Sequence, residues 1–166
     1  DNHLSVARPE IREIIKEIEK IADKMQQSIR RMIRDLKPGD LDEFGLKDSL
    51  NELVHRWQEL YPQTHFVLIM QGIFDDLNSM LCITIYRIIQ ESLTNVAKYA
   101  EASNVFVHLR HYTNLKENID CLLLRIHDDG KGIDIEKPHE GFGLAGMRER
   151  VLAARGEFVL DKSYLV

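Results

Sequence analysis

Polar side chains recur at intervals of four and three residues in the stretch IIQESLTNVAKYA. If this stretch is helical, Glu91, Asn95 and Lys98 share one stripe, because residues three and four apart lie on the same face of an α-helix. A carboxylate, an amide and an ammonium in a row could hold Mg²⁺ and phosphate, since Mg²⁺ takes few protein oxygens and completes its shell with water and phosphate. An ordinary solvent-facing helix stripe has the same spacing, and the spacing alone does not separate the two.

Two carboxylates and two glycines follow the apolar run CLLLR in the stretch IHDDGKGID. We expect the strand to deliver Asp128 at a sheet edge, where a carboxylate can accept a hydrogen bond from an exocyclic amine such as that of adenine. Gly130 and Gly132 would let the backbone turn and approach a flat ring without a Cβ in the way. A hairpin connection with an Asp-Gly turn is the alternative that this segment leaves open.

Three glycines within six positions lead into residues that favour helix in the stretch GFGLAGMRER. Gly141, Gly143 and Gly146 would place several backbone N–H groups near a helix N-terminus, which suits an anionic phosphate. Judged by itself, this stretch also fits a purely structural glycine-rich turn.

The elements that must position these residues follow from the apolar periodicity. Interleaved helices and strands predict an α+β fold, a two-layer α/β sandwich in which one helix layer covers a mixed sheet, preceded by a long amphipathic helix. The predicted helices cover residues 9–36, 46–60, 77–100 and 145–154, and the predicted strands cover residues 65–70, 104–112, 121–127 and 156–162.

The first of these helices has a single apolar seam and an opposite face rich in charge. Isoleucines and methionines step by three and four from Ile11 to Met32, which is typical of a coiled-coil or bundle helix that needs a partner. Pro38 and Gly39 should end it. We therefore divide the chain into residues 1–38 and a globular domain over residues 39–166.

The charge balance excludes one broad class of partner. A net charge of −5 and a pI near 5.8 argue against a nucleic-acid binder that works through a general basic surface. The longest apolar runs are too short to cross a bilayer, so we expect no direct membrane contact for this segment.

Taken together and in this order, the three stretches resemble the ATP-binding domain of sensor histidine kinases and their GHKL ATPase relatives, the Bergerat type. QESLTNVAKYA resembles the N box, DDGKGID the first glycine box and GFGLAGMRER the second glycine box. The linking stretches LKPGDLDEFGLKDSL and YRIIQESLTN further resemble the nitrate and sugar-phosphate sensors among bacterial two-component systems.

The resemblance implies ATP and Mg²⁺ as cofactors and a role for each matching residue. Asn95 would ligate Mg²⁺, Glu91 would support the metal or a nearby water, and Lys98 would face phosphate. Asp128 would read the adenine amine in a pocket shaped by Gly130 and Gly132. The remaining matches would form the hinge and phosphate cradle of the ATP lid: Gly141, Gly143, Leu144, Gly146 and Met147.

The resemblance also implies a place in a phosphorelay. The γ-phosphoryl group of ATP would pass to a histidine and then to an aspartate on a response regulator receiver domain. The protein would dimerise through the N-terminal helix of this segment, and residues 1–38 would be the second helix of an incomplete dimerisation and phosphotransfer hairpin. The family places its acceptor histidine, followed by an acidic residue, on the first helix of a dimerising hairpin. His3 is followed by Leu4, and the other six histidines lack this motif too, so we expect the acceptor outside this segment. We expect a cytoplasmic portion of a membrane-anchored bacterial sensor.

Two alternatives remain at this stage. In a GHKL ATPase, Glu91 would activate water in place of an external acceptor. In a degenerate, non-catalytic dimerisation module, no nucleotide would bind. Tyr99, which stands where the family usually has histidine, keeps the second alternative open.

Overall fold

The computed structural model describes residues 14–18, 21, 39–116, 118–132 and 143–161. The chain divides into two units, Asp1–Lys37 and Pro38–Val166. In the first unit, residues 14–18 are helical, within the long helix that the sequence predicts. The rest of that predicted helix, including its end at Pro38, lies outside the described residues.

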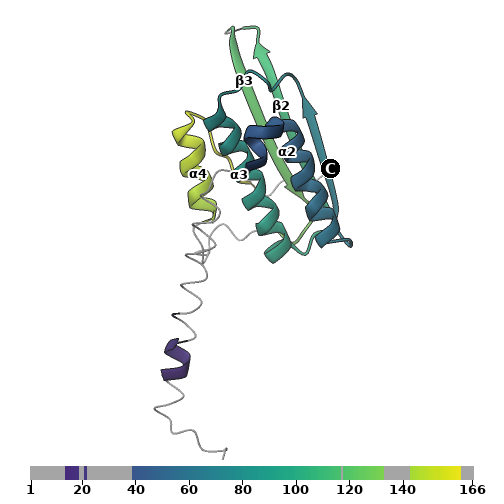
Figure 1. Cartoon of the computed structure of the whole chain (residues 1–166), viewed down its shortest axis with the longest axis vertical. Coiled ribbons are helices and arrows are strands. Elements are labelled where there is room, and N and C mark those ends of the chain that lie inside the picture. The colour runs from purple at the N-terminus through teal and green to yellow at the C-terminus, as the bar shows by residue number, and fades with distance from the viewer. Residues whose placement is uncertain (1–13, 19–20, 22–38, 117, 133–142, 162–166) are drawn as a thin grey trace, which may run out of the picture. The chain divides into compact units, whose positions relative to one another are not determined.

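A mixed three-stranded sheet in the order β1-β2-β3 organises the second unit (Figure 1). β1 (His65–Gln71) pairs in parallel with β2 (Asn104–Asn114), and β2 pairs antiparallel with β3 (Ile119–Asp128). Parallel neighbours need a long crossover, whereas antiparallel neighbours need only a short turn. The chain between β1 and β2 accordingly contains a long helix, and the chain between β2 and β3 is a tight connection.

Three helices form one layer over this sheet. They are α2 (Gly39–Leu60), α3 (Ser79–Asn95), which continues into the π-helical turn η1 (Val96–Ala100), and α4 (Gly143–Ala153). In Figure 1, α3 lies between α2 and α4. The predicted α+β fold, a mixed sheet with one helix layer, is confirmed.

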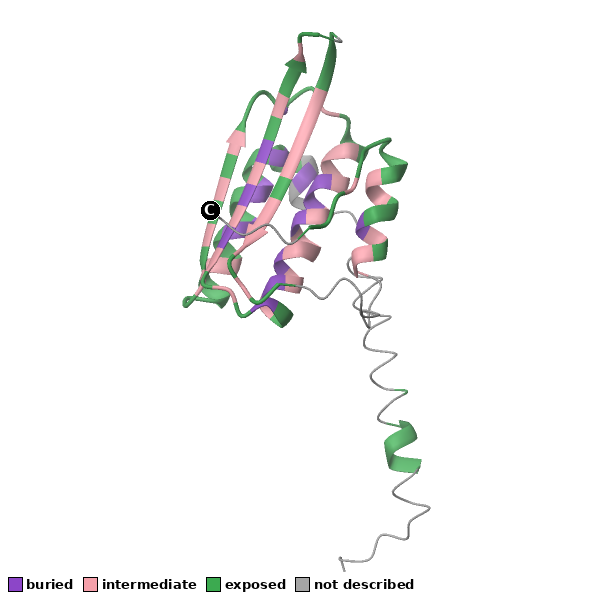
Figure 2. Cartoon of the chain, turned by 180° about the vertical axis from the view of Figure 1, so that it is seen from behind, coloured by how far each residue is buried: buried purple, intermediate pink, exposed green. Residues whose placement is uncertain are grey.

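The core lies between the sheet and the helix layer, because strand residues alternate between the two faces. On β2, Val105, Val107 and Leu109 are buried, and buried and less buried positions alternate along this strand in Figure 2. Side chains spaced by three and four residues on the helices pack against them, as expected for an amphipathic helix. The fully buried side chains of the helix layer are Ser49, Leu50, Ile85, Ile89 and Leu93.

The kink in α2 explains where its continuous part begins. Gly45 has φ 75° and ψ 177°, a conformation outside the helical region that glycine adopts without a steric penalty. The regular helix therefore starts at Leu46, where the sequence predicts it.

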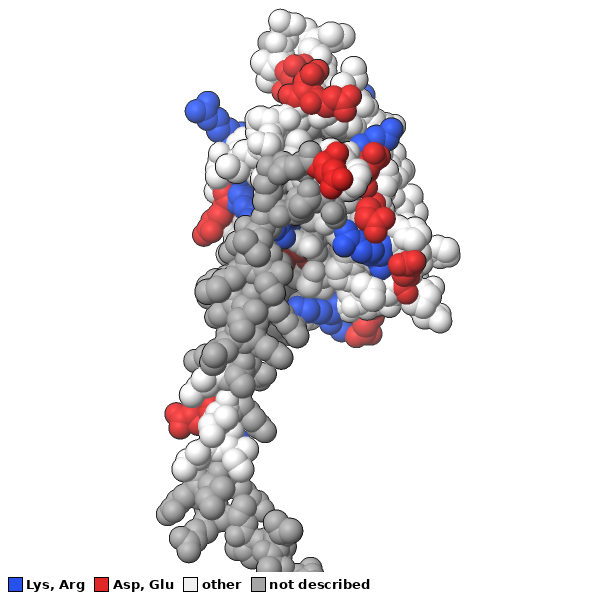
Figure 3. Space-filling view, in the orientation of Figure 1, with Lys and Arg blue, Asp and Glu red and all other residues white. Residues whose placement is uncertain are grey.

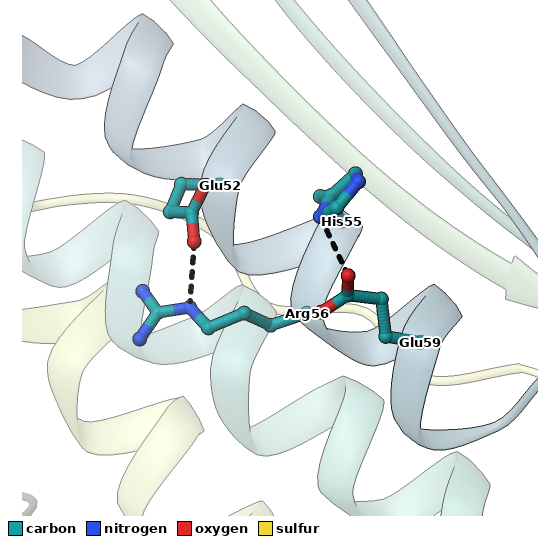
Figure 4. Close-up of polar contacts among 4 residues, drawn as sticks. All are labelled: Glu52, His55, Arg56 and Glu59. Carbon is teal, nitrogen blue, oxygen red and sulfur yellow. Dashed lines mark ion pairs between the residues drawn. The ribbon is translucent and has the colours of Figure 1, made fainter.

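The outer face of α2 carries charge pairs at helical spacing (Figure 4). Arg56 Nε lies 3.4 Å from Glu52 Oε1, and His55 Nδ1 lies 3.8 Å from Glu59 Oε1. Over the face drawn in Figure 3, acidic and basic side chains of the described residues are intermingled. Within the described part of the chain, no helix has the length and apolar character needed to span a bilayer.

The strand predicted over residues 156–162 is wrong for residues 156–161, which form neither helix nor strand. This segment instead turns back on α4: Gly156 N donates to Val151 O at 2.9 Å, and the Arg148 guanidinium stands 5.3 Å from the Phe158 ring centroid. Apolar alternation is compatible with a strand but does not determine it, because strand formation depends on the contacts that a segment makes.

Candidate functional site

The long helix brings two of the predicted polar residues to its border with α4. Its buried positions include Ile85, Ile89 and Leu93, which fix the orientation of the helix on the sheet. Glu91 and Asn95 lie one turn apart beside that apolar face, and both are half-buried. A carboxylate and an amide thus sit side by side at a partly enclosed position.

The second glycine box lies directly against this pair. A Cβ built on Gly143, the first residue of α4, would stand 2.4 Å from Glu91 Oε1 and 3.6 Å from Asn95 Nδ2. One turn later, buried Met147 accepts a hydrogen bond at 3.4 Å from the hydroxyl of Ser92. The structure therefore joins the N box to the second glycine box.

The other members of the second glycine box are less closely engaged. Leu144 and Gly146 are half-buried on the first turn of α4. A Cβ on Gly146 would meet only Arg150 Nη1, at 3.2 Å. Gly141 lies outside the described residues.

The first glycine box packs against the end of the same helix. Lys131 N donates to Ala100 O at 2.9 Å, and a Cβ on Gly130 would stand 2.3 Å from that carbonyl oxygen. The absence of a side chain at Gly130 thus permits a backbone-to-backbone approach. Gly132 has φ 72° and nothing within 4 Å of its Cβ position.

Asp128, the last residue of β3, and Asp129, which follows it, have side chains on opposite faces of the sheet. Asp128 pairs with Val105 in the ladder, so both side chains lie on the face covered by the helices. Its carboxylate accepts a hydrogen bond from Gly130 N at 3.0 Å, which stabilises the turn. Asp128 is half-buried, as a ligand-reading carboxylate at the rim of the helix layer would be.

Asp129 is a structural residue that the sequence reasoning missed. Its Oδ1 accepts from Ser103 N and Asn104 N, both at 2.8 Å, and its Oδ2 accepts from Asn104 Nδ2 at 2.7 Å. The side-chain hydrogen bond from Asn104, followed by the backbone hydrogen bonds, lowers the pKa of Asp129 below its ordinary value. The period of two along a strand was the available signal, because it places neighbouring aspartates on opposite faces.

Lys98 does not continue the stripe in the predicted way. It lies in the π-helical turn η1, where the hydrogen bonds span five residues and the 3.6-residue period no longer applies. Its side chain is exposed, and no described contact joins it to Glu91 or Asn95. The helical extent predicted to Ala100 holds, but the last turn is wider than an α-helical one.

The three motifs meet along the last turns of one helix. Gly143 of the second glycine box lies next to Glu91 and Asn95, and the first glycine box contacts the Ala100 carbonyl oxygen. Asn95 and Ala100 are five positions apart on that helix. Among the residues that the structure describes, parts of all three motifs therefore lie against the same helix.

A hollow of about 500 Å³ opens away from these motifs, on α2. Its lining is mostly charged, and it shares no residue with the three boxes. The location of the candidate site rests on the contacts among the boxes and not on that hollow. The residues that line it are Phe44, Asp48, Ser49, Glu52 and Arg56.

Comparison with known protein families shows to which family the chain belongs. Residues 82–164, half of the chain, match the family described as histidine kinase-, DNA gyrase B- and HSP90-like ATPases. The chain belongs to this family. The match contains the N box and both glycine boxes, so the family expected from the three ordered motifs is confirmed.

The relatives with similar sequences are sensor kinases. The chain is 32% identical to the signal transduction histidine-protein kinase/phosphatase DegS of Brevibacillus brevis, over 88% of this chain and 36% of that protein. It is also 32% identical to the kinase/phosphatase UhpB of Salmonella typhimurium, over 87% of this chain and 28% of that protein. The chain thus spans about a third of the length of these relatives. They agree with the predicted resemblance to the nitrate and sugar-phosphate sensors.

A solved structure is similar at lower identity. The histidine kinase domain of the blue-light activated histidine kinase from Erythrobacter litoralis is 20% identical, with a TM-score of 0.48 over 64% of this chain and 50% of that chain.

Gly130→Ala should destabilise the fold. The new Cβ would overlap the Ala100 carbonyl oxygen, a backbone atom that can move only with the helix end, so we expect a loss of about 1–3 kcal/mol in the free energy of unfolding, measured by denaturant titration. Gly146→Ala is the matched control, because its nearest atom ends a flexible arginine side chain. Equal losses for the two variants would contradict the proposed contact.

Asp129 should make stability depend on pH in the acid range. Folding lowers the pKa of the Asp129 carboxyl group. The stability that the ionised carboxylate contributes is therefore complete above about pH 5. It is lost as the pH falls below the unfolded-state pKa of about 3.9 and then through the lower folded-state pKa. Asp129→Asn should therefore lower the melting temperature at pH 7, and the difference from the parent chain should shrink toward pH 3. Exposed Asp76→Asn serves as the control. A difference independent of pH would show that the ionised carboxylate is not what stabilises this junction.

Proposed function

We propose that the Pro38–Val166 unit binds ATP with Mg²⁺ along the end of α3, between the two glycine boxes. The observation that carries this proposal is the contact of Gly143 with Glu91 and Asn95, on the same helix whose end meets Gly130. Titration of the purified chain with a non-hydrolysable ATP analogue, with and without Mg²⁺, tests it. Absence of saturable binding under both conditions would refute it.

The donor set fits a magnesium ion. Asn95 offers an amide oxygen and Glu91 a carboxylate one turn away, and Mg²⁺ accepts one or two protein oxygens while water and phosphate complete its shell. When bound, Mg²⁺ would neutralise charge on the phosphates. Lys98, exposed on η1, would face the phosphates from the same helix end, with Gly143, Leu144, Gly146 and Met147 on the opposite side.

Asp128 would select the base. Its half-buried carboxylate lies on the helix-facing side of the sheet, and Gly130 N holds one of its oxygens. The remaining oxygen lone pairs can accept a hydrogen bond from an exocyclic amine. Adenine has that amine, whereas guanine presents a carbonyl oxygen at the equivalent position.

The whole protein would act as a sensor histidine kinase. The γ-phosphoryl group would pass to a histidine outside this segment and then to an aspartate of a response regulator receiver domain. Phosphoryl transfer of this kind depends on positioning and charge neutralisation, which a nucleotide-holding domain supplies. The first helix supports a homodimer, since Ile14, Ile18 and Ile21 recur at helical spacing and are exposed.

Asp128→Asn should weaken binding of adenine nucleotides by about 1.5–3 kcal/mol, the scale of a lost charge-assisted hydrogen bond. The variant keeps an oxygen for Gly130 N, so the turn should survive. Calorimetric titration against Asp120→Asn, at the other end of β3, separates the base contact from a general charge effect. Unchanged affinity for the Asp128 variant would refute the assignment of the base pocket.

Asn95→Ala should remove most of the gain in nucleotide affinity that Mg²⁺ provides, by about tenfold or more, because loss of even a supporting group at a metal site costs about 10–100-fold. Binding without Mg²⁺ should remain. Thr84→Ala, eleven positions earlier on the same helix, is the control. Equal losses with and without the metal would count against Asn95 as a ligand.

Rapid steady-state hydrolysis of ATP that Glu91→Gln abolishes would instead favour the ATPase alternative.

A further inference from the structure

At the start of α4, the Glu91 side chain of α3 occupies the space next to Gly143, so a side chain on residue 143 would not fit there. Glu91 Oε1 lies 2.4 Å from the position of a Cβ on Gly143, and the Glu91 carboxyl carbon lies 3.3 Å from it. Real Cβ atoms do not approach oxygen so closely, so an alanine at this position would force one of the two groups to move. The Glu91 carboxylate occupies space that exists only because residue 143 is glycine.

The group that would move is the carboxylate. Glu91 Oε1 ends a flexible side chain, whereas residue 143 belongs to the backbone of α4, which buried Met147 anchors one turn later. Rotating a glutamate costs little compared with displacing a packed helix. A side chain at position 143 would therefore turn Glu91 away and leave the helices in place.

Asn95 shares this corner. Its Nδ2 lies 3.6 Å from the same Cβ position, an ordinary van der Waals distance that an alanine would satisfy. Added bulk at position 143 would thus disturb Glu91 and spare Asn95. The two groups proposed to serve the metal can be perturbed separately.

We propose that Gly143 is a positioning residue that acts through Glu91: by lacking a side chain, it holds the carboxylate beside Asn95, where it supports the bound metal. This role differs from a backbone contact to phosphate. The consequence for metal binding rests on the proposed function, whereas the contact between Gly143 and Glu91 does not.

A double-mutant cycle on nucleotide affinity tests this role. Gly143→Ala should lower the affinity for the ATP analogue about tenfold with Mg²⁺, the scale of a lost supporting group at a metal site, and should leave the affinity without Mg²⁺ unchanged. Glu91→Ala should cause a similar loss. If Gly143 acts through Glu91, the double variant should bind no more weakly than Glu91→Ala alone.

Additive losses in that cycle, or an equal loss without the metal, would overturn the proposal, because Gly143 would then contact the nucleotide directly. Ala145→Ser is the control, since it adds one heavy atom at an exposed position on the same turn.

Thermal unfolding of the same four proteins without nucleotide examines the contact separately. Gly143→Ala should lower the melting temperature by about 2–4 °C in the chain with Glu91, and by clearly less in the Glu91→Ala chain. Equal shifts in both backgrounds would overturn the contact. A parent chain that binds no nucleotide would refute the proposed function, and this second cycle would still decide whether Gly143 positions Glu91.

Discussion

The carbonyl oxygen of Ala100, at the end of the helix formed by α3 and η1, is the point on which the arrangement of the site depends. It accepts a hydrogen bond from Lys131 N at 2.9 Å and fills the space of a Cβ on Gly130. Asp128 lies two residues before Gly130 and pairs with Val105 in the ladder. The ladder and this backbone contact together hold the first glycine box against the end of the helix, and Asp129 adds hydrogen bonds from Ser103 N and Asn104 N.

Periodicity was sufficient to predict most of the second unit. The strands were predicted from short apolar runs, and the helix through Asn95 from an apolar repeat of three to four residues. Burial alternates along β1 and the first half of β2, but not along β3. The strand predicted at residues 156–162 is wrong for residues 156–161, because alternation describes a surface that could pair but does not determine what it contacts. Residues 156–161 contact α4 through Val151 and Arg148 instead.

The candidate site was predictable as three motifs but not as a set of contacts. No local signal in VAKYA distinguishes a π-helical turn from an α-helical one, so the displacement of Lys98 from the stripe could not be foreseen. The contact of Ser92 with Met147 joins residues 55 positions apart, and helical spacing within one segment cannot reveal it. Glycine was the informative residue type: Gly130 and Gly143 mark close approaches, but the sequence does not say to which atoms.

The polar border between α3 and α4 has a consequence for the stability of the site. Ser92, Glu91 and Asn95 occupy positions where apolar residues would pack α4 more tightly. Helix α4 accordingly has a single buried residue, Met147, whereas α3 has four buried residues. Elements with few buried apolar contacts are displaced at the lowest free-energy cost. Turning the Glu91 side chain costs less than moving either helix, and α4 would move before α3 only where a ligand requires more than that rotation.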